Sequence, residues 1–263
     1  TGTRLDMGSV PLGTIGLASL TLGVLQGHKW GWSSPEIIAC FMGAVVFLTY
    51  VVLRSRQHAE PLIDLSLFQH RRFTSASIAT FAFNLPVAGF WFSAPLFMQT
   101  VWNWSVLKSG CSIMPTPVII FLTATISGRY SDRGWMKRII SSGMLLSGLG
   151  LFGLFVFLDE NVRYFTHYFP FAVLYGIGLG LAWSTLTGAA LMGIDHEKFG
   201  IANGTNLTFR QMGGAMGVAM VIAVSGVAGV AGSAAAFQRV WLALALWVAV
   251  TLAFFTFAYP KDH

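Results

Sequence analysis

The sequence predicts an all-α integral membrane protein in which a two-helix hairpin precedes a six-helix half, giving eight transmembrane helices in total. Composition is the first indication, because 55% of the 263 residues are hydrophobic and only 10% are charged, against about 25% charged in soluble domains. The 22 Phe and 9 Trp agree with this, since lipid tolerates large apolar side chains on a protein's outside. The lengths of the apolar stretches and the charges between them are the second and third indications.

Eight apolar stretches have the length of a membrane span, because a hydrocarbon core of about 30 Å needs about 20 helical residues. Arg210 is the only charged residue inside them. No long alternation of apolar and polar residues occurs, so helices rather than barrel strands are expected to satisfy the backbone in lipid. The predicted spans are 10–26, 37–53, 74–98, 110–128, 139–158, 168–192, 201–226 and 240–258.

The loop charges predict the sidedness, because cytoplasmic loops carry the excess of Lys and Arg. With both termini cytoplasmic, 11 Lys and Arg fall on the inside and 4 on the outside. The longest polar connection, 54–73, suits a short amphipathic helix on the inner surface. It separates a hairpin with its connecting segment (1–64) from a C-terminal six-helix half (65–263).

Several classes of protein are not expected. The net charge of +6 comes from short loops, without the basic cluster that a nucleic-acid partner would require. Cys40 and Cys111 lie in apolar runs, so neither a disulfide framework nor a metal site is expected. An intramembrane enzyme would need a nucleophile, a metal set or paired carboxylates at membrane depth. The sequence holds no such set, and we expect neither an enzyme nor a cofactor.

A loop motif follows the span 110–128 and reads Gly-Arg-Tyr-Ser-Asp-Arg-Gly-Trp-Met-Lys-Arg over 128–138. It resembles the signature cytoplasmic loop of the major facilitator superfamily, although Gly134 stands one place earlier than the usual second glycine. In that family the loop joins the second and third helices of a six-helix half, which is its position here. The resemblance implies a conformational switch, in which Asp132 helps to hold one state closed. Its residues would be Gly128, Asp132, Arg133, Lys137 and Arg138.

Two further stretches, 60–68 and 200–217, resemble the fourteen-span drug:proton antiporters of that superfamily. The resemblance implies that the first two spans are the extra central hairpin of such a protein. The next six would be its C-terminal half. Because the chain begins with Thr1, we expect a fragment whose partner is the missing N-terminal half.

Polar residues within the spans predict which helices line a cavity, because helices beside water need polar groups and helices facing lipid do not. The spans 139–158 and 240–258 contain no charged or amide side chain, and we expect them at the periphery. An embedded Arg usually faces a cavity or a partner. Ordinary helix packing remains the alternative for each candidate cavity residue. The candidates are Asn84, Trp91, Met98, Met114, Tyr175, Trp183, Asn206, Arg210 and Gln211.

The expected function is proton-coupled efflux of drugs or other amphipathic, often cationic, small molecules by alternating access. The expected location is the cell membrane, in lipid contact, as a multi-pass protein of the bacterial inner membrane. No Asp or Glu lies inside a span, so the residue that carries the proton is expected in the absent half. An exporter of one specific metabolite or lipid is the main alternative, and a non-transporting membrane protein is another.

Overall fold

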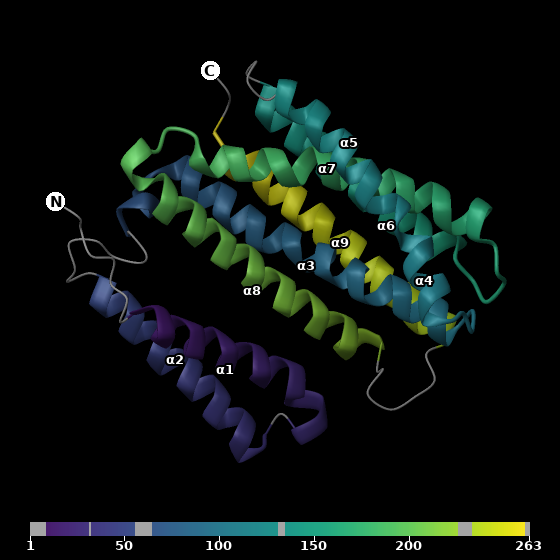
Figure 1. The fold of residues 1–263 in the computed structure, drawn as a ribbon, viewed down its shortest axis with the longest axis horizontal. Helices are drawn as coiled ribbons and strands as arrows, with labels where there is room; N and C mark the ends of the chain where they lie inside the picture. Colours follow the sequence, from purple (N-terminus) through teal and green to yellow (C-terminus); the bar gives the residue numbers. More distant parts are fainter. Residues whose placement is uncertain (1–8, 32, 56–64, 131–134, 226–232, 261–263) are drawn as a thin grey trace.

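The computed structural model of the protein describes residues 9–31, 33–55, 65–130, 135–225 and 233–260, and in these residues it contains helices and no strand. The all-α prediction is therefore confirmed. Helices α1 (Ser9–Trp30) and α2 (Pro35–Ser55) pack against each other as a hairpin, and α1 also contacts α8 (Figure 1). The other α-helices are α3 (Arg71–Thr100), α4 (Val106–Ile113), α5 (Pro115–Tyr130), α6 (Met136–Phe157), α7 (Phe169–Leu191), α8 (Phe199–Ser225) and α9 (Ala234–Ala258).

Six helical segments of the described chain are long and apolar enough to cross a membrane. They correspond to the last six predicted spans: α3, α4 with α5, α6, η3 (Tyr164–Tyr168) with α7, η4 (His196–Lys198) with α8, and α9. Helices α1 and α2 lie where the first two spans were predicted and are 22 and 21 residues long. Their apolar stretches, Pro11–Leu20 and Pro35–Phe47, are shorter than a span. In the part of the chain that the structure describes, length and composition therefore support six spans, and the two spans of the hairpin stay predictions.

The segment at the span predicted for 110–128 consists of two helices, because α4 ends at Ile113, with Met114 as its C-cap, and Pro115 begins α5. Proline has no N–H for the preceding turn, so a new helix starts there readily. The segment also starts earlier than predicted, at Val106, where the Ser105 side chain accepts a hydrogen bond from the Lys108 amide at 3.3 Å. This cap explains why a helix begins in a stretch that contains a lysine.

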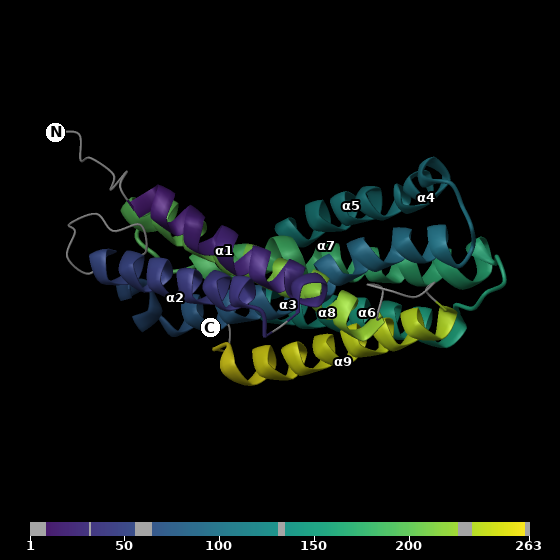
Figure 2. The same ribbon diagram turned by 90° about the horizontal axis from the view of Figure 1, so that it is seen from below.

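The helix ends fall into two groups at opposite ends of the bundle (Figures 1 and 2). The start of α3, the η4 turn and the end of α9 lie at one end, together with the end of α2. The short helix η1 (Leu65–Gln69) packs there, with Leu67 buried and with Lys198 Nζ donating to Ser66 Oγ at 2.9 Å. This grouping agrees with the alternation predicted from the loop charges. The domain boundary at 64/65 adjoins residues 56–64, which lie outside the described part of the chain.

Helix α3 is the centre of the six-helix half and packs against α7, α8 and α9. Pro86 inside α3 cannot donate the hydrogen bond that the Ala82 carbonyl would normally accept. Instead, the indole Nε1 of Trp247 on α9 donates to that carbonyl at 2.9 Å. A second indole, Trp241, donates to Ser93 Oγ at 3.3 Å. Two side chains of α9 therefore satisfy polar groups of α3 inside the membrane.

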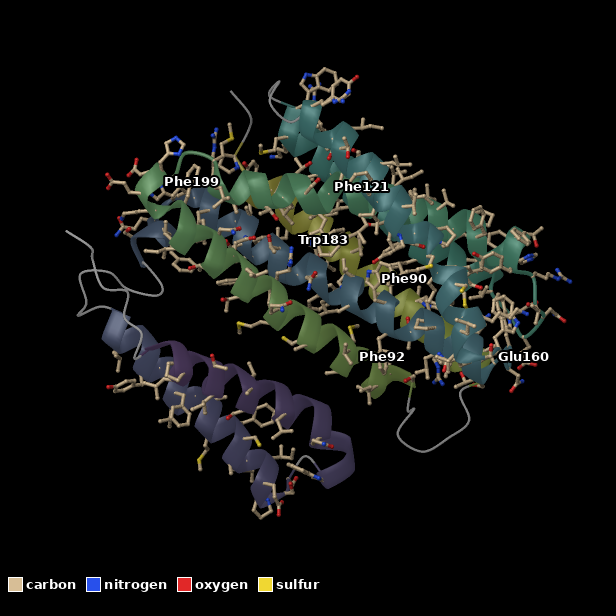
Figure 3. The ribbon with its side chains drawn as sticks, in the orientation of Figure 1. Phe90, Phe92, Phe121, Glu160, Trp183 and Phe199 are labelled. Carbon is tan, nitrogen blue, oxygen red and sulfur yellow. The ribbon has the colours of Figure 1, made fainter. Side chains whose placement is uncertain are left out.

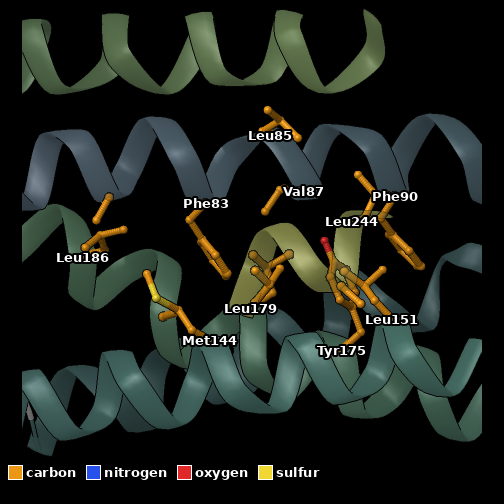
Figure 4. Close-up of a cluster of buried hydrophobic side chains, with 14 of the residues drawn as sticks. Phe83, Leu85, Val87, Phe90, Met144, Leu151, Tyr175, Leu179, Leu186 and Leu244 are labelled. Atoms are coloured by element: carbon orange, nitrogen blue, oxygen red, sulfur yellow. The ribbon is translucent and has the colours of Figure 1, made fainter. Parts of the chain in front are cut away.

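The apolar core lies between α3, α6, α7 and α9 (Figure 4). Phe83 of α3 points towards Met144 of α6 and Leu179 of α7, whereas Phe90 of α3 packs against Tyr175 of α7. Lipid is as apolar as these side chains, so close van der Waals packing rather than exclusion of water holds such helices together.

Small residues bring α3 and α8 into direct backbone contact. A methyl group added to Gly213 would meet the carbonyl oxygen of Phe81, and one added to Gly217 would meet that of Leu85. Two turns before Gly213, Asn206 Nδ2 donates to Ser77 Oγ at 3.3 Å and to Thr80 Oγ1 at 3.2 Å. Glycines four residues apart and interhelical polar contacts are both typical of helix pairs in membranes.

Substitution of Gly213 by alanine is expected to destabilise the protein by about 1–3 kcal/mol, because α3 and α8 must separate to admit the methyl group. Gly204 is the matched control on the same helix, since an added methyl group there meets nothing within 4 Å. Gly204→Ala should leave stability unchanged or raise it by up to about 1 kcal/mol through helix propensity. Thermal unfolding in detergent measures both variants, and equal changes would contradict the proposed close packing.

Candidate functional site

A cavity of about 280 Å³ lies between α5, α7 and α8. Its α7 wall consists of residues 180, 183, 184 and 187, which share one face of a helix because they are spaced three and four apart. Gly180 lets α5 approach α7 closely, since an added methyl group would meet Thr123 Oγ1 and the Ile120 carbonyl. The lining residues are Ile120, Ala124, Gly180, Trp183, Ser184, Thr187 and Arg210.

Arg210 supplies the charge of this cavity. It lies eleven residues after Phe199, the first residue of α8, and therefore about 16 Å along the helix. In the helices that the structure describes, no other charged residue lies more than two turns from both ends of its helix. Its guanidinium carbon lies 5.1 Å from the centre of the Trp183 ring on α7, in cation–π contact. Trp183 lies near the middle of the bundle (Figure 3).

Two donor groups of residues that line the cavity lack an acceptor. The indole N–H of Trp183 is buried and has no hydrogen-bond partner among the described residues. The Arg210 guanidinium likewise forms no hydrogen bond or ion pair with any residue that the structure describes. The lining hydroxyls differ, because Ser184 donates to the Gly180 carbonyl and Thr187 donates to the Trp183 carbonyl. The unsatisfied polar groups of the cavity are therefore donors.

Asn84 and Asn206 join α3 to α8. Asn84 Nδ2 donates to the backbone carbonyl of Arg210 at 2.6 Å, so it fixes the helix at the point where the arginine projects. Asn206 is 2% exposed and bonds to Ser77 and Thr80. Asn84 thus supports the cavity from behind Arg210, whereas Asn206 takes part in helix packing.

The remaining predicted cavity residues do not line this cavity. Tyr175 and Met98 are buried in the core, and the Tyr175 ring packs against Phe90 with centroids 4.2 Å apart. Trp91 is partly buried against the same core. Met114 is 68% exposed where α4 meets α5, and Gln211 is exposed on α8. The structure therefore brings together Trp183 and Arg210, with Asn84 behind them.

Sequence reasoning missed five lining residues, of which three lie on the α7 face beside Trp183 and two lie on α5. A signal for the α7 group was present, since Gly180 and Thr187 lie three and four residues from Trp183, and Ser184 lies four residues from Gly180. For Ile120 and Ala124 of α5 no such signal exists, because both are ordinary residues of an apolar helix.

The described residues of the predicted switch motif lie at the end of the bundle that carries η4. Asp132 and Arg133 fall outside the described residues. Gly128 is exposed, and an added methyl group there would meet nothing within 4 Å. Lys137 Nζ donates to the Tyr259 carbonyl at 2.7 Å, and the Arg138 guanidinium lies 5.4 Å from the centre of the Trp135 ring. The described part of the motif therefore links the start of α6 to the end of α9.

Comparison with known proteins identifies the family. The sequence profile of the Major Facilitator Superfamily matches residues 5–218. The chain is 30% identical over 225 residues to a cephamycin export protein of Amycolatopsis lactamdurans, covering 85% of this chain and 46% of that protein. It is 27% identical to a multidrug transporter protein of Bacillus subtilis, covering 84% of this chain and 41% of that one. It is 26% identical to a tetracycline resistance determinant of Streptomyces rimosus, covering 79% of this chain and 60% of that one.

The chain spans about half the length of these curated relatives. The family profile nevertheless covers most of its residues, and the described helices include six of membrane-spanning length. This chain is a multi-pass membrane protein that belongs to the Major Facilitator Superfamily.

Proposed function

We propose that this chain is part of a transporter that exports drugs or other amphipathic small molecules in exchange for protons by alternating access. The observation that carries the proposal is the cavity between α5, α7 and α8, where Arg210 and Trp183 meet deep within the helices of a superfamily member. Ionisable groups at membrane depth are rare and usually mark a transport pathway. The names of the relatives, which include an export protein, a multidrug transporter protein and a resistance determinant, support the same function.

In this proposal residues 65–263 form one half of the transporter and supply one wall of its central cavity. The other wall comes from an N-terminal half, and residues 1–64 form the hairpin between the halves. The open side of α5 supports this arrangement, because large apolar side chains lie on it and need a protein or lipid neighbour. These side chains are Val118, Phe121, Leu122 and Ile126, each more than half exposed. The site of action would be the bacterial inner membrane.

Transport by the full-length protein in vesicles tests the proposal. With an imposed proton gradient, a fluorescent amphipathic substrate should move faster than in protein-free vesicles, and an uncoupler should abolish the difference. A panel of unrelated substrates separates drug efflux from export of one specific metabolite or lipid, since only the first predicts transport of several panel members. Equal flux with and without the protein, for every compound, would contradict a transport function.

A further inference from the structure

We propose that Arg210 and Trp183 form a subsite for the anionic group of a substrate, such as a carboxylate attached to an aromatic ring. The inference rests on the proposed transport function, because it names the chemical class that the same cavity accepts. It differs from the expectation drawn from the sequence, in which the substrate was often cationic. The structure favours the opposite charge for three reasons.

The first reason is the sign of the charge. Arg210 is a permanent cation, because guanidinium stays protonated at any biological pH. Helices α3 to α9 contain no Asp or Glu, so none of them offers a carboxylate to neutralise it. A cation held at membrane depth without a counter-ion is unfavourable, and an anion in the cavity would relieve this. A cationic substrate would instead add a second like charge beside the first.

The second reason is the pattern of hydrogen-bonding groups. The guanidinium of Arg210 is a donor without an acceptor among the described residues, whereas the hydroxyls of Ser184 and Thr187 already donate to backbone carbonyls. A ligand that complements this set must supply acceptors. A carboxylate supplies two oxygens in the geometry that guanidinium binds best.

The third reason is the size and character of the remaining wall. The cavity holds about 280 Å³, which is near the lower end of the roughly 300–1,000 Å³ typical of small-molecule sites. Ile120, Ala124 and the Trp183 ring make most of the rest of its lining apolar. The space therefore suits one ring with an acidic group rather than a whole drug molecule. The exposed ring face of such a ligand would pack on apolar side chains while its charge meets Arg210.

Binding of three matched naphthalene compounds to the purified 263-residue chain tests this subsite. The compounds are 2-naphthoate, its neutral methyl ester and 2-naphthylmethylammonium, which share one ring system and differ in charge. By equilibrium dialysis the anion should bind at least about tenfold more tightly than the other two, as expected for loss of a charge-assisted hydrogen bond. Equal affinity for all three, or preference for the ammonium compound, would overturn the proposal.

Arg210→Gln should remove the preference for 2-naphthoate while leaving the affinity for the methyl ester unchanged, which shows that the cavity is still formed. Arg210→Lys should retain part of the preference, because the charge stays but the planar fork of donors is lost. Arg239→Gln on α9 is the matched control, since that arginine does not line the cavity, and it should bind all three compounds as the unchanged chain does. An unchanged preference in Arg210→Gln would also overturn the proposal.

A carboxylate side chain from another part of the transporter is the other source of an acceptor for Arg210. Repeating the dialysis with the full-length protein distinguishes the sources. If the 263-residue chain binds 2-naphthoate and the full-length protein does not, a protein carboxylate occupies the subsite and the substrate proposal is wrong. The transport assay in vesicles tests the proposed function separately from the dialysis experiment. Export of cations without anions would contradict the anionic subsite alone, whereas no export of any compound would contradict the function.

Discussion

Substitution of Asp132 by asparagine in the full-length transporter is expected to lower gradient-driven export by about tenfold or more, the size of a typical coupling between conformational states. The variant keeps the shape of the side chain and removes its charge. The neighbouring described residue Lys137 already links the start of α6 to the end of α9 through the Tyr259 carbonyl. The resemblance to the family motif implies that the charge of Asp132 biases how the helix ends meet during the transport cycle.

Asp195→Asn is the matched control for this substitution. Asp195 is an exposed residue of another loop at the same end of the bundle, and its side chain caps no helix. The Asp195→Asn variant should export substrate at the normal rate. Both variants should insert into the membrane and be purified in normal amounts, since Asp195 is exposed in a loop and the sequence predicts that Asp132 lies in a loop outside the spans. If Asp132→Asn exports substrate normally at normal expression, the motif has no role as a switch and its charges only set the orientation of the protein in the membrane.

The 263-residue chain alone is expected to show no gradient-driven transport, which is a complete loss relative to the full-length protein. Helices α3 to α9 hold no carboxylate that could take up and release a proton, and Arg210 cannot do so because its guanidinium stays charged. In addition, the described residues that line the cavity come from α5, α7 and α8. Under the proposed arrangement these helices belong to one half of the transporter, and alternating access would require a second half against which this one rocks.

Vesicles that contain the chain, the full-length protein or no protein provide the comparison, with the same imposed gradient and the same fluorescent substrate. The full-length protein confirms that the gradient and the substrate are adequate. Movement of substrate by the chain alone, faster than in protein-free vesicles and abolished by an uncoupler, would show that no further half is required.

The sequence was sufficient for the fold class and for the positions of the helices, because the boundary between lipid and water separates apolar runs from charged loops. The predicted span 139–158 and the observed α6, Met136–Phe157, agree closely. The start of α9 was missed by six residues. Gln238 lies between the observed start of α9 and the predicted start of the span at residue 240. Its side chain donates to the Leu158 carbonyl, so this first part of α9 is packed against the end of α6.

The candidate site was predictable only in part, since a span in lipid can be apolar on every side and its sequence does not reveal which side meets another helix. Met98 and Met114 both looked suited to a cavity wall, yet one is fully buried in the core and the other is 68% exposed. Arg210 was predictable because a charge at membrane depth needs a polar neighbour or a cavity. Its partner Trp183 depends on the rotation of α7 relative to α8, which only the packed structure defines.

Two hydrogen bonds from indole N–H groups of α9 join this helix to α3. Positions on these two helices can therefore serve as fixed references when movement of the protein is measured. Trp247 donates to the carbonyl that Pro86 leaves vacant, and Trp241 donates to Ser93. Separating the helices would leave buried polar groups unpaired in lipid, at about 1–3 kcal/mol each. Probes attached to α3 and α9 should therefore keep a constant separation through a transport cycle. Distances measured from either of them to the second half would then report the rocking of one rigid body against another.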